Sequence, residues 1–379
     1  MSQPRELVIV GSGFAALQLV KALRKRDAQR PIRLITADSG DDYHKPDLSH
    51  VASRDQSAAG MIRSAAAAWA AEYGISVQTH CAVTAIDRVQ RQLQTAQGEV
   101  AYDQLVLATG ARALRPQVDG HERLLTLNSL QEYAAIEPRL RAARHVTLMG
   151  GGLIGCELAM DLASSGRAVT LVDLASTLLS SLLPATLSQP LQQQLQGLGV
   201  TLRLGQTLAS VQVDGDGERV TLANGEVWST DLVLVASGLA PNTELAAAAG
   251  LKVERGIVVD SQLRTSDPFI YALGDCAAWQ GKVQPFLQPA MLGAQALAAT
   301  LTGTPTTLQL PPMLLRVKTP RYPLQLAGRT TGDDLRWQIE LDAGGVLAKA
   351  FNGLQQLCGF VAGGARSEAG LALLRELPR

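Results

Sequence analysis

The chain has 379 residues, 46% of them apolar and 18% charged, so it can bury a sizeable core in about two to three domains, and intrinsic disorder is excluded. Its 34 basic and 34 acidic residues leave no net charge, which disfavours a nucleic-acid binder, as does the aromatic content of 4%. No stretch reaches about 18 uncharged apolar residues and the first residues do not resemble a signal peptide, so we expect a cytoplasmic protein without a membrane span.

The chain opens with a buried strand, a glycine-rich turn and a helix. Residues 6–10 predict the strand, the sequence GSGFAA at 11–16 predicts the turn, and residues 17–26 predict an amphipathic helix that ends in basic residues. A second strand at 32–36 runs into Asp38. This order of elements is typical of a βαβ unit that binds a dinucleotide.

The same order of elements returns in the middle of the chain. A strand at 145–149 is followed by GGGLIG at 150–155, a helix at 156–164, and a strand at 168–172 that ends at Asp173. A single glycine-rich turn is weak evidence for a nucleotide site, because such turns are common. Two copies, each between a strand and a helix and each with an acid downstream, indicate two dinucleotide sites.

The residue types of each turn suit a dinucleotide. The first glycine permits a tight turn, and the second lets backbone N–H groups approach a pyrophosphate at the positive end of the helix. The third glycine lets the helix pack closely on the strand, and in the first copy Ala16 takes its place.

The acid after the second strand of each copy can accept hydrogen bonds from a ribose. In the first copy we expect Asp38 to do so, although Asp41 and Asp42 lie in the same loop. In the second copy Asp173 would repel a 2′-phosphate, and residues 174–180 contain no Arg or Lys to neutralise one. The second site therefore favours NADH over NADPH.

Three further buried strands complete the two units. Residues 105–111 and 232–242 each predict a buried strand that ends in a turn of small residues, and residues 269–276 predict a third such strand with Asp275 at its carboxyl end. Ligands of open α/β sheets bind at such ends, so Asp275 is well placed to meet a polar ligand group. Residues 289–302 predict an alanine-rich helix.

A smaller region follows a proline-rich boundary at 311–323. Short strands are predicted near 337–341, 346–351 and 358–361, with a closing helix near 368–376. These elements indicate a small α+β domain.

The cysteines and histidines do not favour metal or disulfide chemistry. His44, Asp47 and His50 lie close in sequence, but loop residues at that spacing are usually ordinary polar positions, so we expect no metal site. No HExxH or GxSxG motif occurs, which leaves hydrolase chemistry unsupported. The cysteines form no CxxC pair, and we expect four buried thiols, Cys81, Cys156, Cys276 and Cys358.

Together these motifs resemble the flavoprotein reductases of the pyridine nucleotide–disulfide oxidoreductase superfamily. The matching segments are GSGFAA, the sequence ATGA at 108–111, GGGLIGCELA at 150–159, the turn from Gly238 to Asn242, and ALGDCA at 272–277. The resemblance implies an α/β fold like that of glutathione reductase, with two Rossmann-like domains and a small C-terminal α+β domain. The implied boundaries are 1–112 with 243–310 for the FAD domain, 113–242 for the NAD domain, and 311–379 for the C-terminal domain.

The branch of the superfamily is indicated by the segment that stands where other members carry their redox-active cysteines. The segment YHKPDLS at 43–49 resembles a motif of ferredoxin and rubredoxin reductases, and the region that begins LRVKTP at 315–320 is most similar to bacterial rubredoxin–NAD(+) reductases. Many ferredoxin reductases carry Arg and Lys where this chain has Lys45 and His50. The resemblance implies hydride transfer from NADH to FAD, followed by transfer of single electrons to rubredoxin, a small acidic iron–sulfur protein.

The resemblance also implies roles for individual residues. Lys45 and Glu157 are expected on the N5 side of the flavin, Lys318 near its pyrimidine end, and Val83 at the adenine. A surface lysine and a solvent-exposed helix acid are the plain alternatives for the first two. The full set of expected cofactor-binding residues is Gly11, Ser12, Gly13, Ala15, Ala16, Asp38, Lys45, Pro46, Val83, Ala108, Thr109, Gly110, Gly150, Gly152, Leu153, Ile154, Gly155, Glu157, Asp173, Gly238, Gly274, Asp275, Gln288 and Lys318.

Other functions stay open at this level. The same flavin chemistry could serve a [2Fe–2S] ferredoxin or a quinone. A redox sensor that binds FAD and NADH without rapid turnover is a second class, and a domain that kept the fold but lost FAD is a third.

Overall fold

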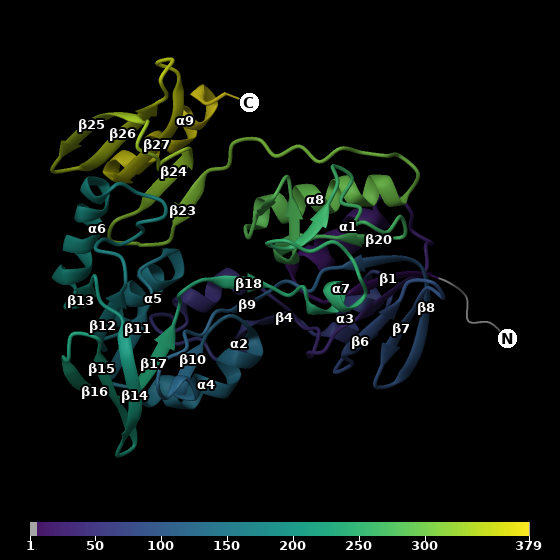
Figure 1. Ribbon diagram of the computed structural model, residues 1–379, viewed down its shortest axis with the longest axis horizontal. Coiled ribbons are helices and arrows are strands. Elements are labelled where there is room, and N and C mark those ends of the chain that lie inside the picture. Colours follow the sequence, from purple (N-terminus) through teal and green to yellow (C-terminus); the bar gives the residue numbers. More distant parts are fainter. Residues whose placement is uncertain (1–5, 379) are drawn as a thin grey trace. The chain divides into compact units, whose positions relative to one another are not determined.

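The computed structural model describes residues 6–378, which divide into two compact units (Figure 1). Unit 1 comprises residues up to 45, 59–112 and 239–310, and unit 2 comprises 46–58, 113–238 and the residues from 311 onward. Breaks fall at 112 and 310, and a third falls at 238, whereas the sequence analysis placed that boundary at 242. The division into three domains stays a prediction. Residues 46–58, which the sequence analysis placed in the FAD domain, group with unit 2 instead.

Unit 1 is built on a seven-stranded sheet whose first four strands are parallel. Its order is β5-β2-β1-β8-β7-β6, and β20 pairs with β8. The strands β1 and β8 are almost fully buried where they pair, because parallel strands in α/β folds are covered on both faces. The strands are β1 (Glu6–Val10), β2 (Ile32–Ile35), β5 (Ser76–Gln78), β6 (Val83–Asp87), β7 (Gln92–Thr95), β8 (Gly98–Leu107) and β20 (Ile270–Ala272).

Two helices of unit 1 pack against each other (Figure 1). Helix α1 (Phe14–Arg24) buries one apolar stripe that includes Leu19 and Leu23, and α8 (Leu287–Leu301) buries mainly alanines, whose small side chains permit a close approach. The remaining elements are α2 (Ala58–Met61), α3 (Ala66–Glu72), α7 (Glu244–Ala248), β3 (Asp42–Tyr43), β4 (Ile62–Ser64), β19 (Ile257–Val259), β21 (Ala277–Trp279) and β22 (Lys282–Val283).

Unit 2 contains a second parallel sheet, in the order β10-β17-β11-β12-β13. A three-stranded antiparallel sheet, β14-β15-β16, adds a second layer of apolar side chains to it. The bounds are β10 (Leu124–Thr126), α4 (Leu130–Ala142), β11 (His145–Met149), α5 (Leu153–Ser164), β12 (Ala168–Asp173), α6 (Ala185–Gly197), β13 (Thr201–Leu204), β14 (Leu208–Asp214), β15 (Gly217–Leu222), β16 (Val227–Thr230) and β17 (Leu232–Val235).

The C-terminal part of unit 2 is an antiparallel sheet with one helix. Its order is β23-β24-β27-β26-β25, and α9 packs on β27 through Phe360, Leu373 and Leu377. The α/β fold class with a C-terminal α+β region is confirmed. The bounds are β23 (Leu315–Val317), β24 (Leu324–Gly328), β25 (Arg336–Asp342), β26 (Gly345–Phe351), β27 (Leu357–Gly364) and α9 (Gly370–Glu376).

The structure also bears on the membrane, metal and cysteine expectations. Across residues 6–378, no helix has the length and apolar character needed to cross a membrane, and no three His, Cys, Asp or Glu side chains gather as a metal site would require. All four cysteines are free thiols, and three of them are buried. Cys358 departs from the expectation because it is only half-buried, with its Sγ 3.4 Å from the Ala350 carbonyl oxygen.

Candidate functional site: two glycine turns and a buried acid cluster

The first glycine turn follows β1 and requires a glycine at its first position. Gly11 has φ +109°, and a Cβ there would lie 2.2 Å from the carbonyl oxygen of Ala108. Its N–H donates to the Ile35 carbonyl oxygen at 2.8 Å. At Gly13, which caps α1, an added Cβ would meet nothing within 4 Å. The turn is therefore tight at its base and open at the helix N-terminus, where a phosphate would sit.

Asp38 is the acid that reaches this turn. Its Oδ1 accepts hydrogen bonds from the Ser12 hydroxyl at 2.9 Å, the Thr36 hydroxyl at 2.7 Å and the Gly40 N–H at 2.9 Å. Asp41 instead accepts from the N–H of Ala66 at the start of α3. The structure thus brings Asp38 to the first glycine turn, while Asp41 serves a helix start.

Residues from the last part of the sequence of unit 1 lie against the same turn. Gly274 has φ +79°, and a Cβ there would lie 2.7 Å from Ala15 in the first turn of α1. Asp275 follows it, and burial raises the pKa of its carboxyl group while Lys45 lowers it. Ala15, Gly274, Asp275 and Lys45 are thus gathered in one region of unit 1.

The turn after β8 is fixed by Asn242. The Thr109 hydroxyl donates to the Asn242 carbonyl oxygen at 2.9 Å, and the Asn242 side-chain amide donates to the Thr109 carbonyl oxygen at 2.8 Å. The Asn242 N–H donates to the Gly110 carbonyl oxygen at 2.9 Å.

Two other residues of unit 1 are expected to contact FAD. Val83 starts β6, and Gln288 lies in the first turn of α8. Their contact with a cofactor stays a prediction.

The second glycine turn, after β11, repeats the first. Gly150 has φ +114°, a Cβ there would lie 2.5 Å from the Ala236 carbonyl oxygen, and its N–H donates to Val172 at 2.8 Å. At Gly152, which caps α5, an added Cβ would again meet nothing within 4 Å. A Cβ at Gly155 would lie 1.8 Å from the Gly150 carbonyl oxygen. The third glycine is thus needed because the turn itself approaches α5, rather than because of helix–strand packing alone.

Asp173 is tied to this turn through backbone N–H groups. Its Oδ2 accepts from the Gly151 N–H, and its Oδ1 accepts from the Ala175 N–H at 2.7 Å. Ile154, on the first turn of α5, is 48% exposed. An exposed apolar side chain next to an open helix N-terminus provides a surface for a nucleotide. Gly238, farther along, has φ +113° and accepts from the Leu114 N–H at 3.0 Å.

Glu157 on α5 is buried, with 6% of its surface exposed, which excludes the alternative of a solvent-exposed helix acid. Its Oε2 accepts from the Ser49 hydroxyl at 2.6 Å, and its Oε1 accepts from the Lys318 N–H at 2.8 Å. The Lys318 Nζ donates to the Pro46 carbonyl oxygen at 3.1 Å. Three segments of unit 2 therefore converge on one buried carboxylate.

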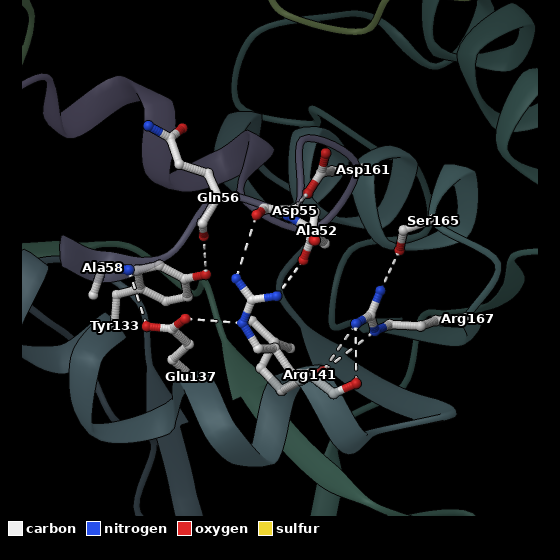
Figure 2. Close-up of polar contacts among 11 residues, drawn as sticks. Ala52, Asp55, Gln56, Ala58, Tyr133, Glu137, Arg141, Asp161, Ser165 and Arg167 are labelled. Carbon is white, nitrogen blue, oxygen red and sulfur yellow. Dashed lines mark hydrogen bonds and ion pairs between the residues drawn. The ribbon is translucent and has the colours of Figure 1, made fainter. Parts of the chain in front are cut away.

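Residues 46–58, which we call the strap, are held against α4 and α5 (Figure 2). Asp161 of α5 accepts from the Ala52 N–H at 2.9 Å and from both the N–H and the hydroxyl of Ser53. Glu137 of α4 accepts from the Ala58 N–H at 2.9 Å, and the Tyr133 hydroxyl donates to the Gln56 carbonyl oxygen at 2.5 Å. The Ala58 and Arg141 bonds lower the pKa of Glu137.

Sequence reasoning did not find Ser49, Asp161 or the anchors on α4. One signal for Asp161 was available, because Glu157 and Asp161 stand four residues apart and so share one face of α5. Lys45 belongs to unit 1 and Glu157 to unit 2, and their expected pairing at a flavin stays a prediction.

Comparison with known proteins agrees with this geometry. The family model described as pyridine nucleotide-disulphide oxidoreductase matches residues 5–299, and the model described as rubredoxin binding C-terminal domain matches residues 307–377.

The chain is 60% identical over 376 residues to a protein of Aeromonas hydrophila subsp. hydrophila named nitric oxide reductase FlRd-NAD(+) reductase, covering 99% of this chain and 97% of that protein. It is 48% identical over 372 residues to the protein of that name from Escherichia coli, covering 98% and 99%. Among solved structures it resembles the ferredoxin reductase for the CYP199A2 system from Rhodopseudomonas palustris, with a TM-score of 0.89, 28% identity, and coverage of 99% and 96%.

Proposed function

The chain belongs to the pyridine nucleotide-disulphide oxidoreductase family, and from that premise we propose that its electron acceptor is the rubredoxin domain of a flavorubredoxin. Membership confirms the reaction class expected from the sequence. The chain is an FAD-dependent oxidoreductase of the rubredoxin–NAD(+) reductase type, it uses NADH, and it transfers electrons to an iron–sulfur partner of the rubredoxin type. The more specific acceptor is proposed because relatives 60% and 48% identical over nearly the whole chain are named nitric oxide reductase FlRd-NAD(+) reductase, and we take FlRd to denote a flavorubredoxin.

We assign the two cofactors to the two glycine turns. The turn after β1, with Asp38 and Asp275, is proposed to hold FAD, because its open helix N-terminus suits a pyrophosphate and its acid suits a ribose. The turn after β11 is proposed to hold NADH. FAD, when bound, accepts a hydride and gives up its electrons singly.

The protein's own residues orient these groups and select the nucleotide. Asp173 is fixed by two backbone N–H groups beside the second turn, so its charge stays where a 2′-phosphate would lie. No Arg or Lys occurs at 174–180 to compensate it, which supports a preference for NADH. Glu157 is held by Ser49 and by the Lys318 backbone, and it is our candidate for the residue that positions groups at the reacting ring.

The acceptor surface is proposed to include the cations beside this acid. Arg316 on β23 and Arg321 just beyond it are exposed, and neither forms an ion pair with any residue from 6 to 378. Rubredoxins are acidic, so exposed arginines in the segment whose Lys318 N–H binds Glu157 would steer such a partner. Electron-transfer complexes are small, and complementary charge raises the rate at which the partners meet.

Steady-state acceptor assays test this proposal. Purified enzyme with NADH should reduce the rubredoxin domain of a flavorubredoxin much faster than a [2Fe–2S] ferredoxin, and the rate should fall steeply as salt is raised. Arg321→Glu should slow reduction of the rubredoxin domain about tenfold at low salt, whereas Arg336→Glu, an exposed arginine on β25, should change it little. Equal rates with ferredoxin, or equal effects of the two variants, would contradict the proposed acceptor.

We also propose that the protein works in the cytoplasm. NADH is the reductant of that compartment, and the four cysteines are free thiols, as in proteins of reducing environments. Cell fractionation would test this location, and recovery of the enzyme outside the cytoplasmic fraction would refute it.

A further inference from the structure

His50 is the one residue of the strap that can change its charge near neutral pH. It ends the short 3-10 helix at Lys45–His50, and only 7% of its surface is exposed. Ser49 just before it donates to Glu157 at 2.6 Å and Ala52 just after it donates to Asp161 at 2.9 Å, so both buried acids of α5 act on His50 electrostatically. The anchors in Figure 2 hold the strap, and therefore His50, against this helix.

The charges around His50 do not balance. Glu157 and Asp161 contribute two carboxylates, and Lys318 contributes one cation. Arg54 also acts on His50, but it is 53% exposed and forms an ion pair with Asp47 of the same strap at 3.2 Å. The buried cluster therefore keeps one uncompensated negative charge when His50 is neutral and none when it is protonated.

Opposing effects act on the His50 proton, and their net result is a pKa below the usual value for histidine. Burial is the largest effect and lowers the pKa of His50, Glu157 and Asp161 raise it, and Lys318 and Arg54 lower it further. In such a balance, one more charge brought close to the cluster changes the protonation of the imidazole.

A charge of that kind is carried by the oxidised nucleotide. Helix α5 begins at the second glycine turn, and Glu157 lies five residues beyond Gly152, a rise of roughly 8 Å along the helix axis. A single ribose joins the nicotinamide ring to the pyrophosphate, so a nucleotide bound at this turn with its ring directed along α5 would bring that ring toward Glu157. The ring is cationic in NAD+ and neutral in NADH.

We propose that His50 is a proton-binding residue that makes the affinity for NAD+, but not for NADH, depend on pH. Protonated His50 repels the cationic ring and neutral His50 leaves the cluster negative, so NAD+ binds less tightly in acid. By linkage, NAD+ must also drive the proton off His50. The inference depends on the use of NAD(H) and on the second turn as its site, and it is independent of which acceptor the enzyme serves.

The experiment measures nucleotide binding and histidine titration in the FAD-loaded, oxidised enzyme. Three ligands share the same ADP-ribose: NAD+, ADP-ribose itself, and 1,4,5,6-tetrahydro-NAD, whose ring is neutral and donates no hydride. Between about pH 7.5 and about pH 5.5, the Kd for NAD+ should rise about threefold or more, while the other two change in parallel with each other and by less. Equal pH dependence for all three ligands would overturn the proposal.

NMR of histidine-labelled protein supplies the reciprocal test. The His50 signal, identified by its loss in His50→Gln, should titrate at lower pH with NAD+ than with ADP-ribose. His50→Gln should remove the extra pH dependence of NAD+ binding, whereas His44→Gln should retain it. If the NAD+ dependence survives in His50→Gln, another group is responsible and the assignment fails.

A milder variant guards against misfolding of His50→Gln. Arg54→Gln removes an exposed cation that lowers the pKa of His50, so both the titration and the pH dependence of NAD+ binding should move to higher pH. Arg219→Gln is the matched control, because Arg219 is equally exposed and pairs with Asp214 at 3.1 Å. Identical profiles for the two variants would contradict the proposal. The acceptor assay described above is unaffected by this outcome, so the two proposals fail separately.

Discussion

The two glycine turns have nearly the same backbone and lead into very different helices. Gly11 and Gly150 share a positive φ, an N–H bond of 2.8 Å to the neighbouring strand, and a close approach to the next strand's end. The residues two and six positions past the third glycine position differ in charge between the two helices. Helix α1 has Gln18 and Ala22 where α5 has Glu157 and Asp161.

This difference shows what each unit adds to a common nucleotide-binding turn. The acids of α5 are buried and bind the strap and the segment at Lys318, so the second helix organises a site as well as capping a phosphate. The first turn instead uses the Ser12 hydroxyl to hold its acid. A serine at the matching Gly151 would place its Cβ 2.8 Å from Leu178, so the second turn holds Asp173 by a backbone N–H.

The largest expected effect comes from the third glycine position. Gly155→Ala places a methyl group 1.8 Å from the Gly150 carbonyl oxygen, so we expect a loss of about 1–3 kcal/mol in unfolding free energy and at least about tenfold weaker NADH binding. FAD content should persist. Denaturant unfolding and nucleotide titration measure both, and Ala16→Gly in the first turn is the control, expected to cost about 1 kcal/mol through helix propensity. If Gly155→Ala bound NADH as tightly as the wild type, the second turn would not need a glycine at its third position, and this prediction would be wrong.

The next largest effect is expected at Asp161 of α5, an acid that has no counterpart in α1. Asp161→Ala leaves the part-buried N–H groups of Ala52 and Ser53 without their acceptor, and we expect it to lower the free energy of unfolding by about 1–2 kcal/mol. Proteolysis should then cut within 46–58 before other sites. Asp161→Asn retains one acceptor oxygen, so its free energy of unfolding should lie between those of the wild type and Asp161→Ala. A strap that stays resistant to protease in Asp161→Ala would contradict its proposed anchoring.

A third variant separates the roles of the two ribose acids. Asp173→Asn removes the charge but keeps one acceptor oxygen for the turn, so discrimination between NADH and NADPH should fall about tenfold in kcat/KM. FAD retention should not change, whereas Asp38→Asn should weaken FAD binding and leave nucleotide choice intact. Unaltered discrimination in Asp173→Asn would remove this residue from the account.

The smallest effect is expected at Cys156, which corresponds to Leu17 of α1. Burial is the main cause that raises the pKa of the Cys156 thiol, with Asp173 and Glu157 adding to it. A raised pKa keeps the group a neutral thiol across physiological pH, so the native enzyme should not react with iodoacetamide at this residue near pH 8. Peptide mapping would detect the adduct. Cys156→Leu should change unfolding free energy by less than about 1.5 kcal/mol.

Local patterns were enough to predict the turns and strands but not the acid cluster. The glycine turns, the strand at 270–272 and Asp275 follow from residue order, because each depends on neighbours in the chain. The bond from Ser49 to Glu157 joins residues 108 apart, and that from Lys318 to Glu157 joins residues 161 apart. The periodicity of a sequence does not predict contacts between residues so far apart in the chain. The grouping of the strap with unit 2 could not be predicted for the same reason, since its partners on α4 and α5 lie far along the sequence.

The most direct test of electron transfer from NADH through FAD to rubredoxin is an anaerobic double-mixing stopped-flow experiment. The enzyme is mixed with NADH, flavin absorbance is followed, and the rubredoxin domain of a flavorubredoxin or a ferredoxin is then added. The account predicts fast bleaching by NADH and fast recovery of flavin absorbance with the rubredoxin domain but not with ferredoxin. Slow bleaching, or recovery that is no faster with the rubredoxin domain than with ferredoxin, would contradict it.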